Sequence, residues 1–223
     1  MNFIILVLFI ILVIVLTVGI KRSNKLNAKY KEEYFEKERK ASFARKKPLT
    51  GLKLISFPSD IREIIVFEER VLNEYDTVLF YYDGAYYSKD SIAESIRKIK
   101  ELFNSEIANL QGCSNTDLKL KYGVANINKL SKMDDNFSML CNYSREISIY
   151  LIHLNEYEKA ASLLEWLVEC GGDTGFIFNF LSDYYIKENR PAKIHTLLKY
   201  ANEINSIRKN SIVRMLTEKL EQS

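Results

Sequence analysis

Two histidines, three cysteines and one glycine-rich stretch are the residues of this chain whose types could carry chemistry. His153 and His195 have no cysteine, histidine or carboxylate at the spacing of a zinc site. The stretch GGDTG at 171–175 does not form a phosphate-binding motif, and it stands where a turn between helices is expected, because glycine commonly ends a helix. The sequence therefore predicts no enzyme activity, no cofactor and no metal site.

The cysteines favour a reducing compartment. Cys113, Cys141 and Cys170 are odd in number, far apart and without a CxxC pair, which is typical of free thiols that pack as small core residues. Asn136 and Asn142 each begin an N-x-Ser pattern typical of a glycosylation acceptor. We expect both to be unmodified, because the other signals place this part of the chain in the cytoplasm.

Residues 3–20, FIILVLFIILVIVLTVGI, contain no charged residue and no proline. A helix of that length, at ~1.5 Å per residue, extends about 27 Å, close to the thickness of the hydrocarbon core of a membrane. A cleaved signal peptide is disfavoured, because no basic residue precedes the apolar run and the run is longer than a signal core. We therefore predict a transmembrane anchor at 1–20.

The segment that follows, 21–47, is strongly basic. It holds eleven Lys and Arg against four Glu, a net charge of +7, whereas the whole chain carries only +3. Because loops rich in Lys and Arg stay on the cytoplasmic side, we expect a single-pass protein with its N-terminus outside and its C-terminal domain in the cytoplasm. The basic run either rests on anionic lipid headgroups or is only a topology signal and solvated spacer. The small overall charge does not indicate a nucleic-acid partner.

The composition becomes globular after Pro48–Gly51, which ends a basic juxtamembrane spacer at 21–50. Apolar periodicity then predicts three helices, at 58–75, 90–110 and 116–131, with a break at SKMDDN, 131–136. Asp83-Gly84 between aromatic runs predicts either a hairpin near 78–88 or a tight turn between two helices. We assign 51–140 to a helical segment that docks on the domain formed by 141–223.

An internal repeat begins at residue 141. Two copies, 141–174 and 175–208, align without a gap, and a third register from about 209 reads as a closing cap helix. The residues that match at an offset of 34 include Ile147 with Leu181, Ser148 with Ser182, Asn155 with Asn189, Ala160 with Ile194, and Leu164 with Leu198.

This pattern resembles the tetratricopeptide repeat family, whose unit is 34 residues of helix–turn–helix. The shared features are the large-then-small pair midway through the first helix, the asparagine between the helices, Tyr157 and Ala160. The match is closer in the first copy than in the second, where Pro191 and Ile194 replace Tyr157 and Ala160. The resemblance implies an all-α, superhelical repeat domain, here with two repeats and a capping helix at 141–223.

The resemblance also implies a concave groove lined by the first helix of each repeat, of the kind that binds peptides. The groove positions would be Asn142, Arg145, Ile149, Ile152, Phe176, Asn179, Asp183 and Lys187. Ile149 and Phe180 stand where a carboxylate clamp would need asparagine, so we do not expect the groove to bind a C-terminal carboxylate. The alternative is that a segment of the protein itself fills the groove, or that copies associate through it.

A tyrosine-rich turn is a second candidate contact, because exposed aromatic residues concentrate binding energy. It contains Tyr81, Tyr82, Tyr86 and Tyr87, which could equally be buried in the core. Together these features predict a membrane-anchored scaffold or adaptor that binds a protein partner at the cytoplasmic membrane face. The alternatives are a subunit of a membrane complex whose transmembrane helix also packs with partners, and an exported chaperone-like accessory protein.

Overall fold

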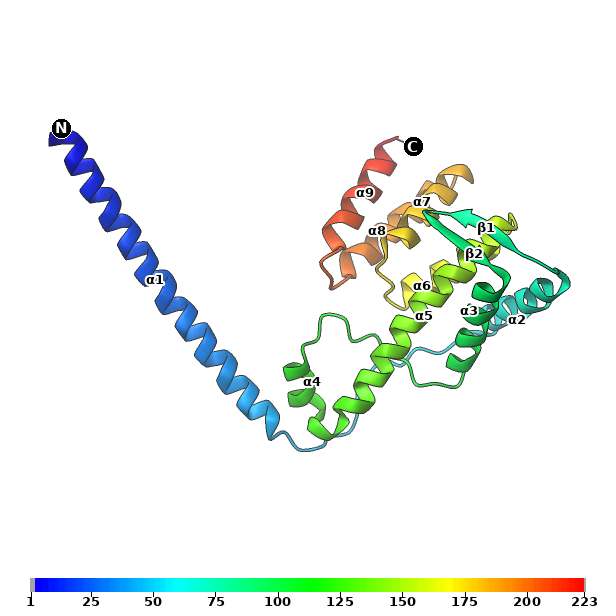
Figure 1. The fold of residues 1–223 in the computed structure, drawn as a ribbon, viewed down its shortest axis with the longest axis horizontal. Coiled ribbons are helices and arrows are strands. Elements are labelled where there is room, and N and C mark those ends of the chain that lie inside the picture. Colours follow the sequence, from blue (N-terminus) through cyan, green and yellow to red (C-terminus); the bar gives the residue numbers. More distant parts are fainter. Residues whose placement is uncertain (1–2, 223) are drawn as a thin grey trace. The chain divides into compact units, whose positions relative to one another are not determined.

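Helices dominate the computed structural model, which describes the backbone of residues 3–222 and the side chains of residues 11–221 apart from residue 14 (Figure 1). They make up 72% of the chain, which confirms the predicted all-α class. Within the described residues the named strands form one two-stranded sheet. The chain divides into an N-terminal unit, Met1–Leu49 with Ser114–Ile127, and a C-terminal unit, Thr50–Cys113 with Asn128–Ser223.

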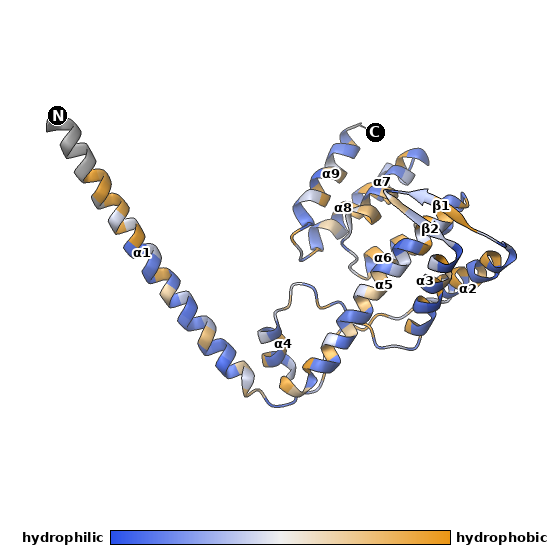
Figure 2. Ribbon diagram, in the orientation of Figure 1, coloured by the Kyte–Doolittle hydropathy of each residue, from blue (hydrophilic) through white to orange (hydrophobic). Residues whose placement is uncertain are grey.

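A long helix, α1 (Phe3–Ser42), forms most of the N-terminal unit. Its residues change from apolar to mainly hydrophilic after residue 20 (Figure 2). Among the residues that the structure describes, no helix has an apolar stretch long enough to cross a membrane. The side chains of residues 3–10 and 14 lie outside the described residues, and the anchor expected at 1–20 stays a prediction.

The C-terminal part of α1 packs against α4 (Asn115–Tyr122), a helix distant in sequence. Lys37 pairs with Asp117 at 2.7 Å, and Glu38 pairs with Lys119. The hydrogen bond from Lys119 holds the pKa of Glu38 below its usual value, and the hydrogen bond from Lys37 does the same for the pKa of Asp117. Ion pairs therefore join the two helices of this unit.

A glycine ends α4. Gly123 has a φ of +87°, and a Cβ there would lie only 2.1 Å from the carbonyl oxygen of Arg45. A short 3-10 helix, η1 (Val124–Asn126), follows. The helix predicted at 116–131 is therefore wrong, because Gly123 interrupts it. The sequence also assigned residues 114–127 to the segment 51–140, whereas they belong to the N-terminal unit.

The C-terminal unit begins with α2 (Ser59–Glu74), a β-hairpin and α3 (Lys89–Leu102). The hairpin is formed by β1 (Leu79–Tyr82) and β2 (Ala85–Ser88), which pair antiparallel with Tyr82 opposite Ala85. Asp83 and Gly84 connect them with φ values of 48° and 83°, as a two-residue turn of type I′ requires. Of the two predicted alternatives, the hairpin is therefore the one that forms.

Two predicted helix boundaries are wrong. The helix expected at 90–110 ends at Leu102, and Ile107 instead pairs with Ile55 in an isolated antiparallel bridge. The break expected at 131–136 is absent, because α5 (Ile127–His153) continues through it.

The remaining helices follow the 34-residue period. They are α6 (Tyr157–Glu169), α7 (Gly175–Lys187), α8 (Pro191–Glu203) and α9 (Lys209–Gln222). α6 and α8 start 34 positions apart, as do α7 and α9. Asn155 and Asn189 close the preceding helices with φ values of 63° and 54°, the left-handed conformation that asparagine tolerates at a helix end.

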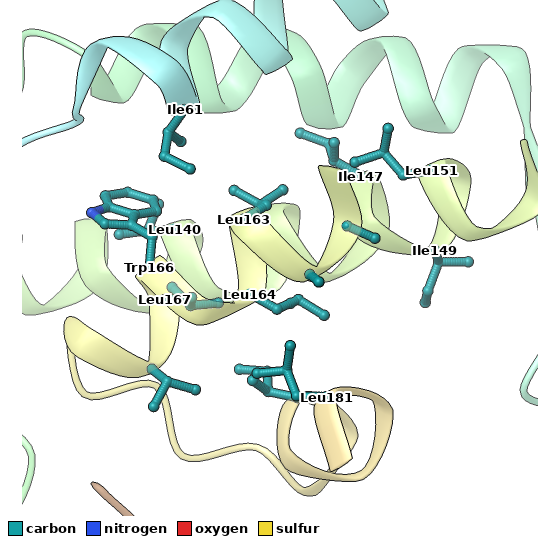
Figure 3. Packing of buried hydrophobic residues seen from close by; sticks show 14 of the residues in the cluster. Ile61, Leu140, Ile147, Ile149, Leu151, Leu163, Leu164, Trp166, Leu167 and Leu181 are labelled. Carbon is teal, nitrogen blue, oxygen red and sulfur yellow. The ribbon is translucent and has the colours of Figure 1, made fainter. Parts of the chain in front are cut away.

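The core of the C-terminal unit includes the repeat helices and α2. Ile147 of α5 and Leu181 of α7, equivalent in the two repeats, are both 0% exposed. In Figure 3, Ile147 lies on the same side of α6 as Leu163 and Ile61 of α2, and Leu181 lies on the other side, near Leu164. Burial of each such side chain contributes about 2 kcal/mol. Trp166 is only 8% exposed, so it packs in the core and does not form part of a binding surface.

Candidate protein-binding surface

The predicted groove residues come from two helices. α5 supplies Asn142, Arg145, Ile149 and Ile152, and α7 supplies Phe176, Asn179, Asp183 and Lys187. Ile149 is buried, while Arg145, Ile152 and Phe176 are half-buried and the other four are exposed. The residues therefore lie on the helices expected, and their contacts show what lies against this face.

Arg145 is bound by the β-hairpin. Its Nη1 donates a hydrogen bond to the hydroxyl of Tyr87 at 3.2 Å, and its Nη2 pairs with the carboxylate of Asp83 at 3.1 Å. The guanidinium carbon also lies 4.9 Å from the centre of the Phe176 ring, within the range of a cation–π contact. Arg145 therefore contacts the turn of the hairpin, strand β2 and helix α7.

The inner face of the hairpin is aromatic and covers α5. The ring of Phe80 stacks on His153, with centroids 4.0 Å apart and planes 3° apart. Tyr87, opposite Phe80 in the sheet, is only 6% exposed, and Tyr82 contacts Phe176 edge to face. A segment of the protein itself therefore occupies this part of the predicted groove, one of the alternatives that the sequence left open.

The other end of the groove face contacts the last helix. Lys219 of α9 donates a hydrogen bond to Asn179 Oδ1 at 2.7 Å and pairs with Asp183. Lys187 lies over the ring of Tyr157 at 4.9 Å. A shallow pocket of about 440 Å³ is left beside Tyr82 of the hairpin and the start of α7. Most of the predicted groove residues therefore hold parts of the unit together.

The outer face of the hairpin is exposed. Leu79, Tyr81 and Tyr86 are 72%, 61% and 75% exposed, and the rings of the two tyrosines contact edge to face at 5.0 Å. The tyrosine-rich turn thus divides by strand alternation: Tyr82 and Tyr87 face inward, while Tyr81 and Tyr86 face outward. The prediction treated the four tyrosines as one contact, although successive side chains of a strand point to opposite faces.

A buried ion pair connects α2 to the first repeat. The carboxylate of Glu68, which is 0% exposed, pairs with Lys159 of α6 at 3.0 Å. Among the described side chains, Glu68 Oε2 and the hydroxyl of Tyr150 are buried without a hydrogen-bond partner. Burial raises the pKa of Tyr150 to about 12. Because Glu68 is buried, this ion pair helps to hold α2 against α6 and is not part of an exposed binding surface.

Two of the three cysteines have thiols whose pKa is raised by burial. Burial raises the pKa of both Cys141 and Cys170 to about 12, which disfavours the nucleophilic thiolate near neutral pH. No group of three His, Cys, Asp or Glu side chains among the described residues could hold a metal ion. A pocket of about 370 Å³ lies beside Lys53, Asn109 and Cys170, and the raised pKa of Cys170 disfavours a nucleophilic role for its thiol there.

Comparisons with protein-family models, with curated proteins and with solved structures found no match.

Proposed function

We propose that this protein is a membrane-anchored adaptor whose helical repeats, similar to tetratricopeptide repeats, present a binding surface for a protein partner at the cytoplasmic face. The observation that carries the proposal is the 34-residue spacing of the helices from α6 to α9, together with the equivalent left-handed turns at Asn155 and Asn189. Stacked helix pairs with this period form extended surfaces that bind other proteins.

The distribution of charge supports the membrane part of the proposal. The N-terminal unit holds thirteen Lys and Arg against five Asp and Glu, and the C-terminal unit nineteen against twenty-four. A basic unit directly after an apolar segment favours cytoplasmic retention and attraction to anionic headgroups. The acidic C-terminal unit gains little from the same lipid surface, and its exposed surface stays available to a protein partner.

The anchor is tested by deleting residues 1–20 from the full chain. We expect the full chain to resist alkaline extraction from membranes and the shortened chain to be released. A shortened chain that still resists extraction would contradict the anchor.

The orientation is tested with Cys113, which is exposed. A membrane-impermeant maleimide applied to intact cells should label it only after permeabilisation, and a Cys113→Ser variant corrects for the other thiols. Labelling of Cys113 on intact cells would place the domain outside and favour the exported accessory protein.

A further inference from the structure

We propose that the hairpin binds an extended, Lys- and Arg-rich segment of a partner protein, which adds to β1 as a third strand. The inference rests on the proposed function and names the surface and the chemical class of partner. We call this surface the β1 edge; it consists of the free backbone edge of Leu79–Tyr82 and the outward side chains of Leu79, Tyr81 and Tyr86.

The pairing register determines which backbone N–H and C=O groups of β1 are left without a partner in β2. Tyr82 with Ala85 and Phe80 with Tyr87 are the pairs that exchange backbone hydrogen bonds across a two-residue turn. The N–H and C=O groups of Leu79 and Tyr81 therefore point away from β2, to the free edge of β1.

The corresponding edge of β2 is capped at Ser88. The amide of Ser88 donates to Ser91 Oγ at 2.9 Å, and Ser91 Oγ donates back to the carbonyl of Ser88 at 2.8 Å. The first of these bonds and the hydrogen bond that the Ser91 amide donates to Ser88 Oγ at 3.2 Å form the capping box of α3. An incoming strand consequently finds unpaired groups at Leu79 and Tyr81 of β1, whereas Ser88 of β2 is already satisfied.

The β1 edge lacks the features that normally block strand addition. Natural edge strands carry Lys, Pro, bulges or inward charges that prevent pairing with another chain. The strands LFYY and AYYS contain none of these residues, and their register is regular. Leu79, Tyr81 and Tyr86 offer apolar contact beside the edge, so an added strand would gain both backbone hydrogen bonds and side-chain packing.

Charge selects the partner. The acidic residues around the hairpin, all exposed, are Glu74, Asp76, Asp83 and Asp90, of which Asp83 is already paired with Arg145. The one cation within residues 74–90 is Lys89, which is half-buried and donates to the carbonyl of Tyr75. The surface is therefore acidic and aromatic, which is complementary to Lys and Arg, because these residues pair with carboxylates and lie over tyrosine rings.

The inner face makes the surface preorganised. Arg145 holds Asp83 and Tyr87, and Phe80 stacks on His153. Binding to β1 therefore does not require the hairpin to be ordered first, which lowers the entropic cost of association.

The test uses the full chain in mild detergent and three fluorescent octapeptides, with alternating Lys and Val, Thr and Val, or Glu and Val. Fluorescence anisotropy should show binding of the Lys/Val peptide, about tenfold weaker binding of the Thr/Val peptide and none of the Glu/Val peptide. A Lys/Val peptide N-methylated at every second residue keeps its charge but loses the backbone N–H groups along one edge of the strand. Two such peptides exist, one for each edge. The peptide methylated on the edge that pairs with β1 should bind at least tenfold more weakly.

Matched variants locate the site. Tyr81→Ser should weaken Lys/Val binding about tenfold, as for a central aromatic contact, and Asp76→Asn about twofold to threefold, as for an exposed ion pair. Asp135→Asn changes an exposed acid on α5 that is not part of the hairpin, and it should leave binding unchanged. Hydrogen exchange of α6 checks that each variant is folded.

Several outcomes would overturn the proposal. These are equal binding of the N-methylated and unmodified peptides, an Asp135→Asn effect equal to that of Asp76→Asn, or no binding of the Lys/Val peptide. Sedimentation that shows a dimer lost in Tyr81→Ser, without peptide binding, would assign the edge to a second copy instead. Extraction from membranes is a separate readout: peptide binding by a chain that alkaline treatment releases would refute the anchor alone.

Discussion

Replacing Arg145 by methionine should release the hairpin from the repeats. The methionine side chain keeps the length of the aliphatic part of arginine but removes all three polar contacts. The surrounding core is unchanged, because Arg145 itself is half-buried at the surface. The expected result is local opening of β1 and β2 without unfolding of the C-terminal unit.

The magnitude follows from the three contacts. The hydrogen bond to Tyr87 contributes about 1 kcal/mol, and the ion pair with Asp83 about 0.5 kcal/mol, because it is largely solvent-exposed. The contact with the ring of Phe176 adds about 0.5 kcal/mol. The total of about 2 kcal/mol corresponds to a roughly 30-fold larger opening constant of the hairpin.

Hydrogen exchange measured by mass spectrometry checks this value. The paired amides of residues 80–87 should exchange roughly 30-fold faster in Arg145→Met, since exchange from local opening follows its free energy. Amides of α6 should exchange at the wild-type rate. Asp83→Asn is the matched control: it removes only the ion pair, and asparagine suits the positive φ of the turn, so exchange should rise about twofold.

Unchanged exchange of the hairpin in Arg145→Met would refute this reasoning, because the hairpin would then be held by Phe80 and Tyr87 alone. Faster exchange throughout the C-terminal unit would also refute it, since it would show that Arg145 supports the whole fold.

Three further predictions concern packing. Gly123→Ala should destabilise the N-terminal unit by about 3 kcal/mol, because the new Cβ would clash with the Arg45 carbonyl oxygen at a positive φ, and trypsin should then cleave after Arg45 more rapidly. Cys141 should react with iodoacetamide far more slowly than the exposed Cys113 at pH 8, because its pKa is raised to about 12 by burial and little thiolate forms below that pH. Leu164→Ala should lower the free energy of unfolding by about 3 kcal/mol in urea, because Leu164 is 0% exposed. Unchanged cleavage, equal labelling rates or an unshifted urea midpoint would contradict the respective prediction.

Local signals predicted the helices after residue 154 well. The asparagines at 155 and 189 mark the turns because the left-handed conformation is set by the residue itself. The period of 34 then fixes where the following helices begin. Neither inference needs knowledge of contacts between distant residues.

At residues 131–136, contacts with distant parts of the chain stabilise a helix where the local sequence predicted a break. Met133 and Phe137 are 2% and 1% exposed, one turn apart on the buried side of α5. The carboxylate of Asp134 accepts a hydrogen bond from the Leu110 amide at 2.9 Å. The polar residues that suggested a break are thus accommodated in a helix by partners about 24 positions away, which no local pattern reveals.

The candidate site was predicted in part. The family resemblance placed Arg145 of α5 and Phe176 of α7 in one groove, but it could not show that the hairpin contacts both. Arg145 pairs with residues 58 and 62 positions earlier in the chain, a separation at which charge and aromatic content leave many pairings possible. Asp83-Gly84 predicted the turn itself, but not its contact with Arg145 of α5.

The capping of β2 by Ser91 also limits how further molecules can join the sheet. If two copies of the chain met through their β1 strands, the result would be a four-stranded sheet with a Ser88–Ser91 cap at each outer side. At Ser88 of each outer strand, a further copy would find no free amide or carbonyl, because both groups are already bonded to Ser91 of the same molecule. The serines that cap α3 therefore also shorten the outer edge that a further copy could pair with.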